Sequence, residues 1–146
     1  MTHEVETHWM GNMQFNAAID RHTIVMDAPE ISGGSDVGPF PKPLILAALS
    51  GCTGMDVAAI LRKKRKPVDE IKIEVSGTLR DEFPKEYIAV HIAYKFKGPA
   101  ENQDAALKAV KDSQEKYCGV SALLRKALPL TWEVFYNDFR IFTNKA

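Results

Sequence analysis

Cysteine is scarce in this chain, with Cys52 and Cys118 the only two among 146 residues and no C-x-x-C pair. Domains stapled by disulfides, and zinc sites built on paired cysteines, need more cysteines than this. The four histidines are scattered and form no H-E-x-x-H motif. These absences exclude a disulfide scaffold, and they predict neither a metal site nor a bound cofactor.

An excess of either charge is also missing, because 19 Lys and Arg residues balance 19 Asp and Glu residues. Domains that bind nucleic acid usually carry a basic excess. The longest unbroken apolar run is Leu44–Leu49, far below the roughly 20 residues of a membrane-spanning helix. The first residues, MTHEVETHWMGN, lack the basic and then apolar pattern of a secretory signal peptide. We expect a soluble, cytoplasmic protein that binds neither nucleic acid nor a membrane.

The most strongly patterned segment covers residues 44–66, LILAALSGCTGMDVAAILRKKRK, and predicts a helix. Pro43 suits the first helical turn, the cations Arg62–Lys66 suit the negative end of the helix dipole, and Pro67 ends the helix. Apolar side chains cover nearly every face of this helix, whereas one small sheet can bury only a single stripe. A second copy of the chain is the simplest cover for the rest, so we expect a homodimer.

Shorter elements surround this helix. Strands are predicted over residues 5–15 and 23–27, in the alternating pair 71–76 and 88–96, and over 131–139. Gly- and Pro-rich residues 28–43 predict a long loop, and helices are predicted over 103–116 and 119–128. This order of elements predicts one α+β domain over residues 1–146, with a mainly antiparallel sheet.

Cys52 lies in the middle of the predicted 44–66 helix, flanked by Gly51 and Gly54. A lone helix cysteine is commonly a small buried hydrophobe, and burial raises the pKa of a thiol that has no cation beside it. Each glycine in a helix interior costs about 1 kcal/mol relative to alanine, so this pair indicates close approach of another backbone or access for a ligand. Asp56 follows Cys52 by four residues on roughly the same face, where it can accept a hydrogen bond or face solvent.

Cys118 stands at the junction of the two later helices, in KYCGVS. A thiolate at a helix N-terminus is stabilised by the helix dipole, so local physics makes Cys118 the more acidic thiol, and a packed junction residue is the alternative. The cluster Arg62–Lys66 can bind phosphate or cap its helix, and His91 is expected on the polar face of a strand. Spacing alone does not bring Cys52 and Cys118 together.

Two of these segments resemble a known family. PFPKPLILAALSGCTGMDVAAILRKKR and KYCGVSALLRKAL, each with one cysteine, are similar to motifs of the OsmC/Ohr family, and the order of elements agrees over residues 12–137. The resemblance implies an intertwined homodimer with an OsmC-like fold, in which sheets with strands from both chains wrap two long central helices. It also implies thiol-dependent reduction of hydroperoxides at the dimer interface.

Carried over by motif, the resemblance makes Cys52 the peroxidatic cysteine and Cys118 the resolving cysteine, with a disulfide formed between them after peroxide oxidises Cys52. A small dithiol or lipoyl-type reductant would reopen that disulfide. Organic hydroperoxides are the expected substrates, with Leu49, Met55 and Phe40 as walls of an apolar pocket. A non-enzymatic dimer that binds a small molecule or senses redox state is the alternative.

The sequence departs from the family pattern at two charged positions. Relatives usually carry an acidic residue where this chain has Pro43, and an arginine where it has Phe40. In the peroxidases of the family an arginine, held by a glutamate, stabilises the thiolate and orients the peroxide. The charged residues that remain as alternatives in this chain are Arg21, Arg80, Glu30 and Asp36.

Overall fold

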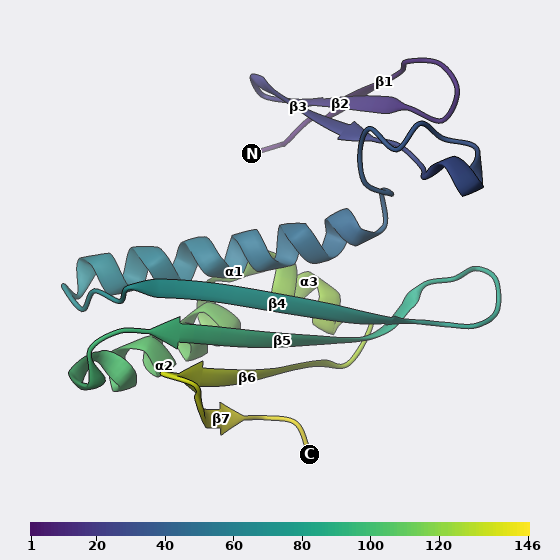
Figure 1. Cartoon of the computed structure of the whole chain (residues 1–146). Coiled ribbons are helices and arrows are strands. Elements are labelled where there is room, and N and C mark those ends of the chain that lie inside the picture. The colour runs from purple at the N-terminus through teal and green to yellow at the C-terminus, as the bar shows by residue number, and fades with distance from the viewer. The chain divides into compact units, whose positions relative to one another are not determined.

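The computed structural model describes residues 1–146, whose contacts fall into two units, Met1–Ile45 and Leu46–Ala146. The boundary between the units falls in the first turn of the long helix α1, Pro43–Lys63 (Figure 1). Each unit has its own sheet, of three strands in the first and four in the second. The single domain expected over residues 1–146 remains a prediction.

The first unit is a three-stranded antiparallel sheet followed by a loop. Its strands are β1 (Glu6–Trp9), β2 (Phe15–Ile19) and β3 (His22–Met26), in the order β1-β2-β3. Short strands in this part of the chain are therefore confirmed, but most of β2 lies outside the ranges expected from the sequence. Strands β2 and β3 are joined at a turn in which Asp20 has φ 54°. Aspartate tolerates this left-handed conformation better than most residues. The one regular element of the loop is the 3₁₀ turn η1 (Glu30–Ser32).

The loop after β3 is built around a buried carboxylate, Asp27. One oxygen of Asp27 accepts a hydrogen bond from the Ala28 N–H at 2.8 Å, and the other accepts from the N–H groups of Ser35 and Val37 at 3.2 Å each. The hydrogen bond from Ala28, followed by those from Val37 and Ser35, holds the pKa of Asp27 below its ordinary value. Gly34 passes so close to Ala28 that a side chain there would collide with the Ala28 carbonyl. The predicted loop is confirmed, and three of its backbone N–H groups donate to the side chain of Asp27.

The second unit contains a four-stranded sheet in the order β4-β5-β6-β7. The strands are β4 (Glu70–Leu79), β5 (Tyr87–Lys97), β6 (Leu130–Tyr136) and β7 (Phe139–Thr143). The β4–β5 hairpin matches the prediction, but the single last strand expected over 131–139 is wrong. Asn137 and Asp138 adopt positive φ angles of 48° and 71° and form a turn, so the chain reverses there into β7.

Strands β5 and β6 are parallel, whereas every other strand pair is antiparallel. Parallel neighbours need a crossover, and here it consists of η2 (Ala100–Asn102), α2 (Gln103–Asp112), η3 (Ser113–Tyr117) and α3 (Gly119–Arg125). The helix expected over 103–116 ends early, because η3 is a π-helical segment. Its last bond runs from the Cys118 N–H to the Ser113 carbonyl at 2.8 Å. Single π-turns are rare and are often found at functional sites.

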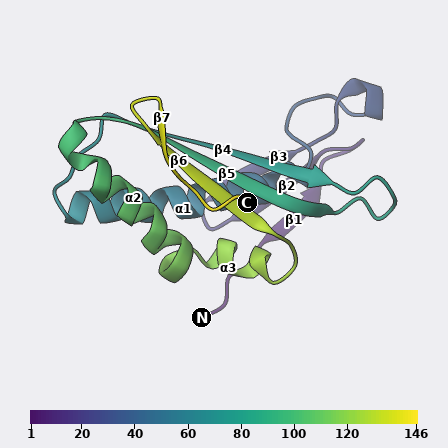
Figure 2. The same ribbon diagram turned by 90° about the horizontal axis from the view of Figure 1, so that it is seen from below.

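All three α-helices pack on one face of the four-stranded sheet (Figures 1 and 2). Helix α1 buries one stripe of four residues at helical spacing, Leu49, Thr53, Val57 and Leu61. Across from it lie the alternate residues of β5 and β6, among them Ile92, Tyr94, Val134 and Tyr136. The other faces of α1 are open within the chain, as the prediction of one covered stripe requires.

By length and composition, α1 is also the one helix that could cross a membrane, a test that core helices of soluble proteins pass as well. The absence of a membrane contact therefore remains a prediction. The helix ends in the cluster of cations that the sequence placed there, with Arg62 and Lys63 in its last turn.

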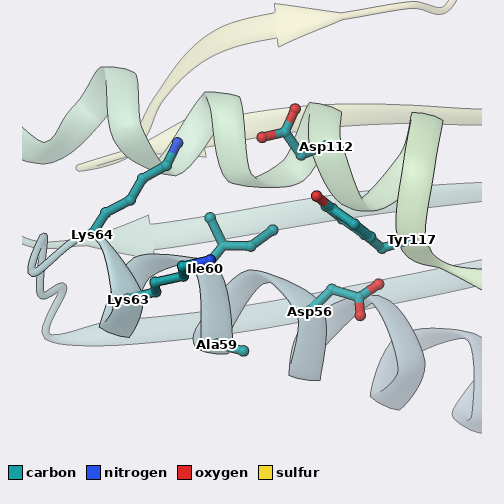
Figure 3. A pocket seen from close by; sticks show the side chains of 7 residues that line it. All are labelled: Asp56, Ala59, Ile60, Lys63, Lys64, Asp112 and Tyr117. Carbon is teal, nitrogen blue, oxygen red and sulfur yellow. The ribbon is translucent and has the colours of Figure 1, made fainter.

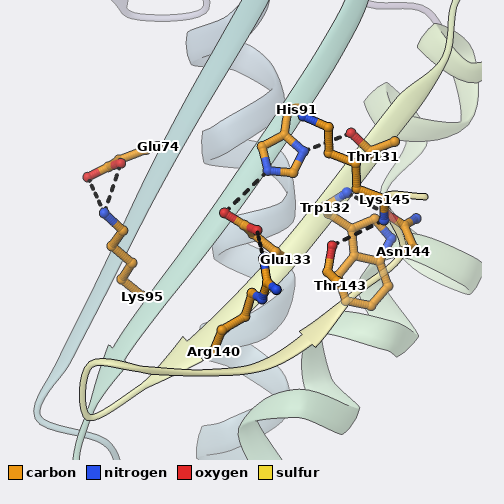
Figure 4. Close-up of polar contacts among 10 residues, drawn as sticks. All are labelled: Glu74, His91, Lys95, Thr131, Trp132, Glu133, Arg140, Thr143, Asn144 and Lys145. Carbon is orange, nitrogen blue, oxygen red and sulfur yellow. Dashed lines mark hydrogen bonds and ion pairs between the residues drawn. The ribbon is translucent and has the colours of Figure 1, made fainter.

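The opposite face of the sheet is polar (Figure 4). His91 contacts the Thr131 hydroxyl at 2.7 Å and the Glu133 carboxylate at 3.5 Å, and Lys95 binds both oxygens of Glu74 at 3.0 Å. The expectation that His91 lies on the polar face of a strand is confirmed. These contacts tie neighbouring strands together and lie on the other side of the sheet from both cysteines.

Candidate functional site

The two cysteines lie against each other in the second unit. Cys52 is in the middle of α1 and Cys118 immediately precedes α3, and the two thiols lie close enough for Cys118 to raise the pKa of Cys52. Both thiols are free, but they differ in access, because Cys118 is 3% exposed whereas Cys52 is only partly buried. The structure thus joins an accessible thiol to a covered one.

Cys118 occupies the N-cap position of α3, as the sequence predicted. Its backbone is extended, with φ −73° and ψ 100°, and its sulfur accepts a hydrogen bond from the Ser121 N–H at 3.4 Å. The next residues of the same turn act on Cys52, because the backbone N–H of Val120 lowers the pKa of the Cys52 thiol. The start of α3 therefore lies beside both cysteines.

Cys52 is a neutral thiol at rest. Burial raises its pKa above the ordinary value, the Val120 N–H opposes that shift, and the Cys118 thiol and the Asp56 carboxylate raise the pKa further. No cation is among the groups that shift it. The sequence argument that burial without a nearby cation would raise the pKa of Cys52 is therefore confirmed.

A chain of buried hydrogen bonds runs beside the cysteines and ends at Asp56. Gln114 donates its side-chain amide to the Tyr94 hydroxyl at 2.7 Å, and Tyr94 and Thr53 lie 2.6 Å apart through their hydroxyl oxygens. Thr53 and Ser113 are 2.7 Å apart, and the Ser113 hydroxyl donates to an Asp56 oxygen at 2.9 Å. An amide nitrogen only donates and a carboxylate only accepts, so each hydroxyl must donate toward Asp56. Burial, first among the causes, raises the pKa of Tyr94 to about 12.

Arg125 fixes the far end of this chain. Its guanidinium donates to the Gln114 backbone carbonyl at 2.8 Å and to the Gln114 side-chain oxygen. With its oxygen bound to Arg125, Gln114 can turn only its NH₂ group toward Tyr94. The sequence analysis proposed no role for Arg125, Gln114 or Tyr94, because nothing in their local patterns sets them apart from other polar residues.

An open groove of about 720 Å³ lies between α1 and the end of α2 (Figure 3). Its lining residues are Asp56, Ala59, Ile60, Lys63, Lys64, Asp112 and Tyr117. Two of the residues expected as pocket walls do not line this groove, since Leu49 is fully buried in the core and Met55 is 75% exposed; their place in a pocket at a dimer interface remains a prediction. The third, Phe40, belongs to the first unit.

Of the charged residues considered as substitutes for the family's ion pair, one belongs to the second unit. Arg80 is bound in the β4–β5 hairpin, to Glu86 at 3.4 Å and to the Phe83 carbonyl at 3.2 Å. The other three, Arg21, Glu30 and Asp36, belong to the first unit. The acid that the second unit does place beside Cys52 is Asp56.

The model of the OsmC-like protein family matches residues 33–133, a stretch that contains both cysteines and the whole hydrogen-bond chain. The chain belongs to the OsmC-like family. Its fold is accordingly the OsmC-like α+β fold, with antiparallel sheets and a central helix, as the resemblance implied.

Two relatives are similar to this OsmC-like chain over most of its length. Protein YhfA of Escherichia coli (strain K12) is 29% identical over 129 residues, which cover 88% of this chain and 93% of YhfA. The crystal structure of a hypothetical protein from Aquifex aeolicus VF5 is 31% identical, with a TM-score of 0.76 over 94% of this chain and 98% of that one.

The organic hydroperoxide resistance protein OhrB of Bacillus subtilis is 18% identical, with a TM-score of 0.63 over 92% and 98% of the two chains. At this identity the likeness to OhrB shows the fold alone.

Proposed function

We propose that this protein reduces organic hydroperoxides in the cytoplasm, with Cys52 as the peroxidatic cysteine and Cys118 as the resolving cysteine. The contact between the two thiols carries the proposal, because a sulfenic acid condenses readily with a thiol already beside it. Their unequal exposure supports these roles, since a hydroperoxide must reach the first thiol and need not reach the second. Membership of the OsmC-like family is consistent with this activity.

The proposed reaction has two oxidative steps. The Cys52 sulfur attacks the terminal oxygen of the hydroperoxide, the O–O bond breaks, an alcohol leaves, and Cys52 becomes a sulfenic acid. The Cys118 sulfur then attacks the sulfenic sulfur, so a disulfide forms and water leaves. A small dithiol of the lipoyl type reduces this disulfide and is itself oxidised to a disulfide, which returns both cysteines to thiols.

The groove beside Asp56 supports an organic substrate over hydrogen peroxide. Ala59 and Ile60 give it apolar surface next to the helix face that carries Asp56 and Cys52. A hydrocarbon substituent that packs there gains roughly 0.8 kcal/mol for each CH₂ removed from water. Hydrogen peroxide has no such group, so the groove would leave its reaction unassisted.

A homodimer built on α1 is part of this proposal. Ala48, Met55 and Ala58 are exposed and recur with Gly51 along one face of the helix. A Cβ on Gly51 would touch nothing in the chain, whereas a Cβ on Gly54 would lie 3.1 Å from the Ile73 Cδ1. A side chain at position 54 would thus crowd β4, whereas Gly51 leaves room for a helix of a second copy.

The raised pKa of Cys52 favours a second candidate function. A neutral thiol reacts far more slowly with peroxide than a thiolate does. An OsmC-like dimer of this kind would bind a small molecule in the groove, or sense the redox state through the Cys52–Cys118 pair, without rapid turnover. The rate of the first oxidative step separates the two candidates.

Single-turnover oxidation by cumene hydroperoxide tests the proposed function. The wild type should lose both free thiols together, and its mass should fall by two hydrogens in a linked peptide pair that contains Cys52 and Cys118. Cys118→Ser should stop at a sulfenic acid on Cys52, which dimedone traps. Cys52→Ser should lose no thiol on this timescale.

Two outcomes would contradict these roles. Oxidation of Cys52→Ser at the wild-type rate would show that Cys52 is not the nucleophile. Separate sulfinic acids on the two cysteines, without a linked peptide pair, would remove Cys118 as the resolving residue. A wild type that forms the disulfide only with a large excess of peroxide over hours would favour the sensor.

A further inference from the structure

The position of Asp56 joins the two thiols, the hydrogen-bond chain and the groove. Asp56 follows Cys52 by one helical turn, and its charge acts on the Cys52 thiol. One of its oxygens is held by the Ser113 hydroxyl at 2.9 Å, and the same side chain lines the groove (Figure 3). The carboxylate is therefore fixed one helical turn from the accessible thiol and in the wall of the groove.

The proposed first step has a proton problem that Asp56 can solve. The attacking group must be a thiolate, yet Cys52 is surrounded by groups that favour its neutral form, apart from the Val120 N–H. The leaving alkoxide is a strong base and needs a proton as the O–O bond breaks. A single group that takes the proton from sulfur and delivers it to the alkoxide serves both needs.

We propose that Asp56 is this proton carrier, an inference that rests on the proposed peroxidase function. Asp56 accepts the proton of the Cys52 thiol as the sulfur attacks the terminal peroxide oxygen. It then gives that proton to the alkoxide oxygen as the O–O bond breaks, so the products are a Cys52 sulfenic acid, an alcohol and an ionised Asp56. The overall reaction consumes one thiol and one hydroperoxide and needs no proton from solvent.

The hydrogen-bond chain keeps Asp56 ready for this task. Because every hydroxyl from Tyr94 to Ser113 donates toward Asp56, the Ser113 hydroxyl fixes one carboxylate oxygen of Asp56 as a hydrogen-bond acceptor. Ser113 binds one oxygen, and no side chain or backbone group donates to the other. That second oxygen is the one available to the thiol and to a hydroperoxide.

The other charged groups around Asp56 differ from it in their contacts. Asp112, at the end of α2, is bound by Lys108 at 3.2 Å and by Lys116 at 3.7 Å, and these lysines with Lys64 hold its pKa below the ordinary value. Besides Asp56, the titratable groups that share the groove or lie beside it are Lys63 at the end of α1, Lys64 just after it, Asp112 on α2, Tyr117 on η3, and the two thiols. None of them combines a place one helical turn from Cys52 with an open carboxylate oxygen as Asp56 does.

The variant Asp56→Asn separates proton transfer from simple charge repulsion, because the two give opposite results. The asparagine keeps an oxygen that can accept from Ser113 but cannot carry the proton. It also removes a negative charge near Cys52, so the thiol pKa, measured by the pH dependence of iodoacetamide alkylation, should fall. If Asp56 carries the proton, peroxide reduction should nevertheless slow by about 100-fold or more at pH 6.5.

The assay follows sulfenic acid formation with cumene hydroperoxide in a Cys118→Ser background, from pH 5 to pH 9. With Asp56 present the rate should change little across this range, because the proton is transferred internally. With Asp56→Asn the rate should rise about tenfold per pH unit up to the thiol pKa, because only the fraction already ionised can react. The matched control is Asp104→Asn, on the exposed first turn of α2, which should keep the original rate and pH profile.

Two results would overturn the inference. An Asp56→Asn protein that reacts as fast as its parent at pH 6.5, or faster, would show that the carboxylate only repels the thiolate. In that case the wild type remains a peroxidase and the proton carrier alone is wrong. A wild type that does not react with cumene hydroperoxide through Cys52 would instead overturn the proposed function, and the role of Asp56 with it.

Discussion

Thr53 and Ser113 are 60 positions apart in the sequence, and their side-chain oxygens lie 2.7 Å apart in the core. Thr53 directly follows Cys52 on α1, and Ser113 begins the π-helical η3, where its carbonyl accepts the Cys118 N–H. One buried hydrogen bond therefore joins the two segments that carry the cysteines. The contact between the thiols depends on this joint between α1 and the crossover.

The first prediction concerns that joint. Thr53→Val keeps the shape of the side chain but removes the hydroxyl, so the buried Tyr94 hydroxyl loses its acceptor and the Ser113 hydroxyl loses its donor. We expect the free energy of unfolding to fall by about 1–3 kcal/mol, the cost of unsatisfied buried polar groups. Urea denaturation measures it. The control Thr78→Val, at an exposed position of β4, should change the stability little, and an equal loss in both variants would contradict the prediction.

The second prediction concerns stability at high pH. An unfolded chain ionises tyrosine near pH 10, whereas folded Tyr94 keeps its proton to about pH 12. Between these values the folded state binds a proton that the unfolded state has lost, so stability falls as pH rises, by roughly 2–3 kcal/mol. Denaturant titrations from pH 9 to 12 should show this fall in the wild type and in Tyr117→Phe. Tyr94→Phe, although less stable at pH 7, should lose this part of the slope, and an unchanged slope would rule the assignment out.

The third prediction concerns the loop of the first unit. The pKa of Asp27 lies below its ordinary value, so the stability it contributes is present above pH 3.8 and disappears as pH falls through the folded-state pKa. Amide exchange at Ser35 and Val37, corrected for intrinsic rates, should show protection at pH 5 that is lost on acidification. Asp27→Asn should lack the protection at both pH values. Asp36→Asn, at a position with φ 55° that asparagine tolerates, should retain it.

The fourth prediction tests the proposed homodimer. Met55 is 75% exposed on the apolar face of α1, where a charge would be costly to bury against a second copy. Met55→Glu should sediment as a monomer at micromolar concentration, while the wild type and the exposed control Ala127→Glu sediment as dimers. A folded, monomeric wild type at that concentration would contradict the dimer itself.

Local pattern in the sequence was enough for much of the fold. Alternation of apolar and polar residues predicts the β4–β5 hairpin, and the proline before α1 and the cations at its end predict the bounds of that helix within a few residues. Each of these signals is complete within about ten to twenty neighbouring residues. The turn at Asn137 and Asp138 escaped the same reasoning, because the strand residues on either side read as one continuous run.

The residues of the candidate site were likewise predictable from the sequence only in part. The motifs around Cys52 and Cys118, and the helical spacing of Asp56, are readable from the sequence, and so is the N-cap position of Cys118. Thr53, Tyr94, Ser113 and Gln114 are not, because a buried hydroxyl and an exposed one look alike in a sequence. Their hydrogen bonds span 20 to 61 positions and exist only once α1, β5 and η3 pack on one face of the sheet.

By itself, then, the sequence determined most of the turns, which residues form the helices and most of the strands, and which side chains carry reactive chemistry, since these follow from short-range sterics and periodicity. Only the tertiary structure decided that Cys52 meets Cys118, that β5 and β6 run parallel, and that a line of hydroxyls ends at Asp56. Those relationships depend on how segments far apart in the sequence pack against one another. Burial of the apolar surface of the whole fold decides that packing, and no single segment does.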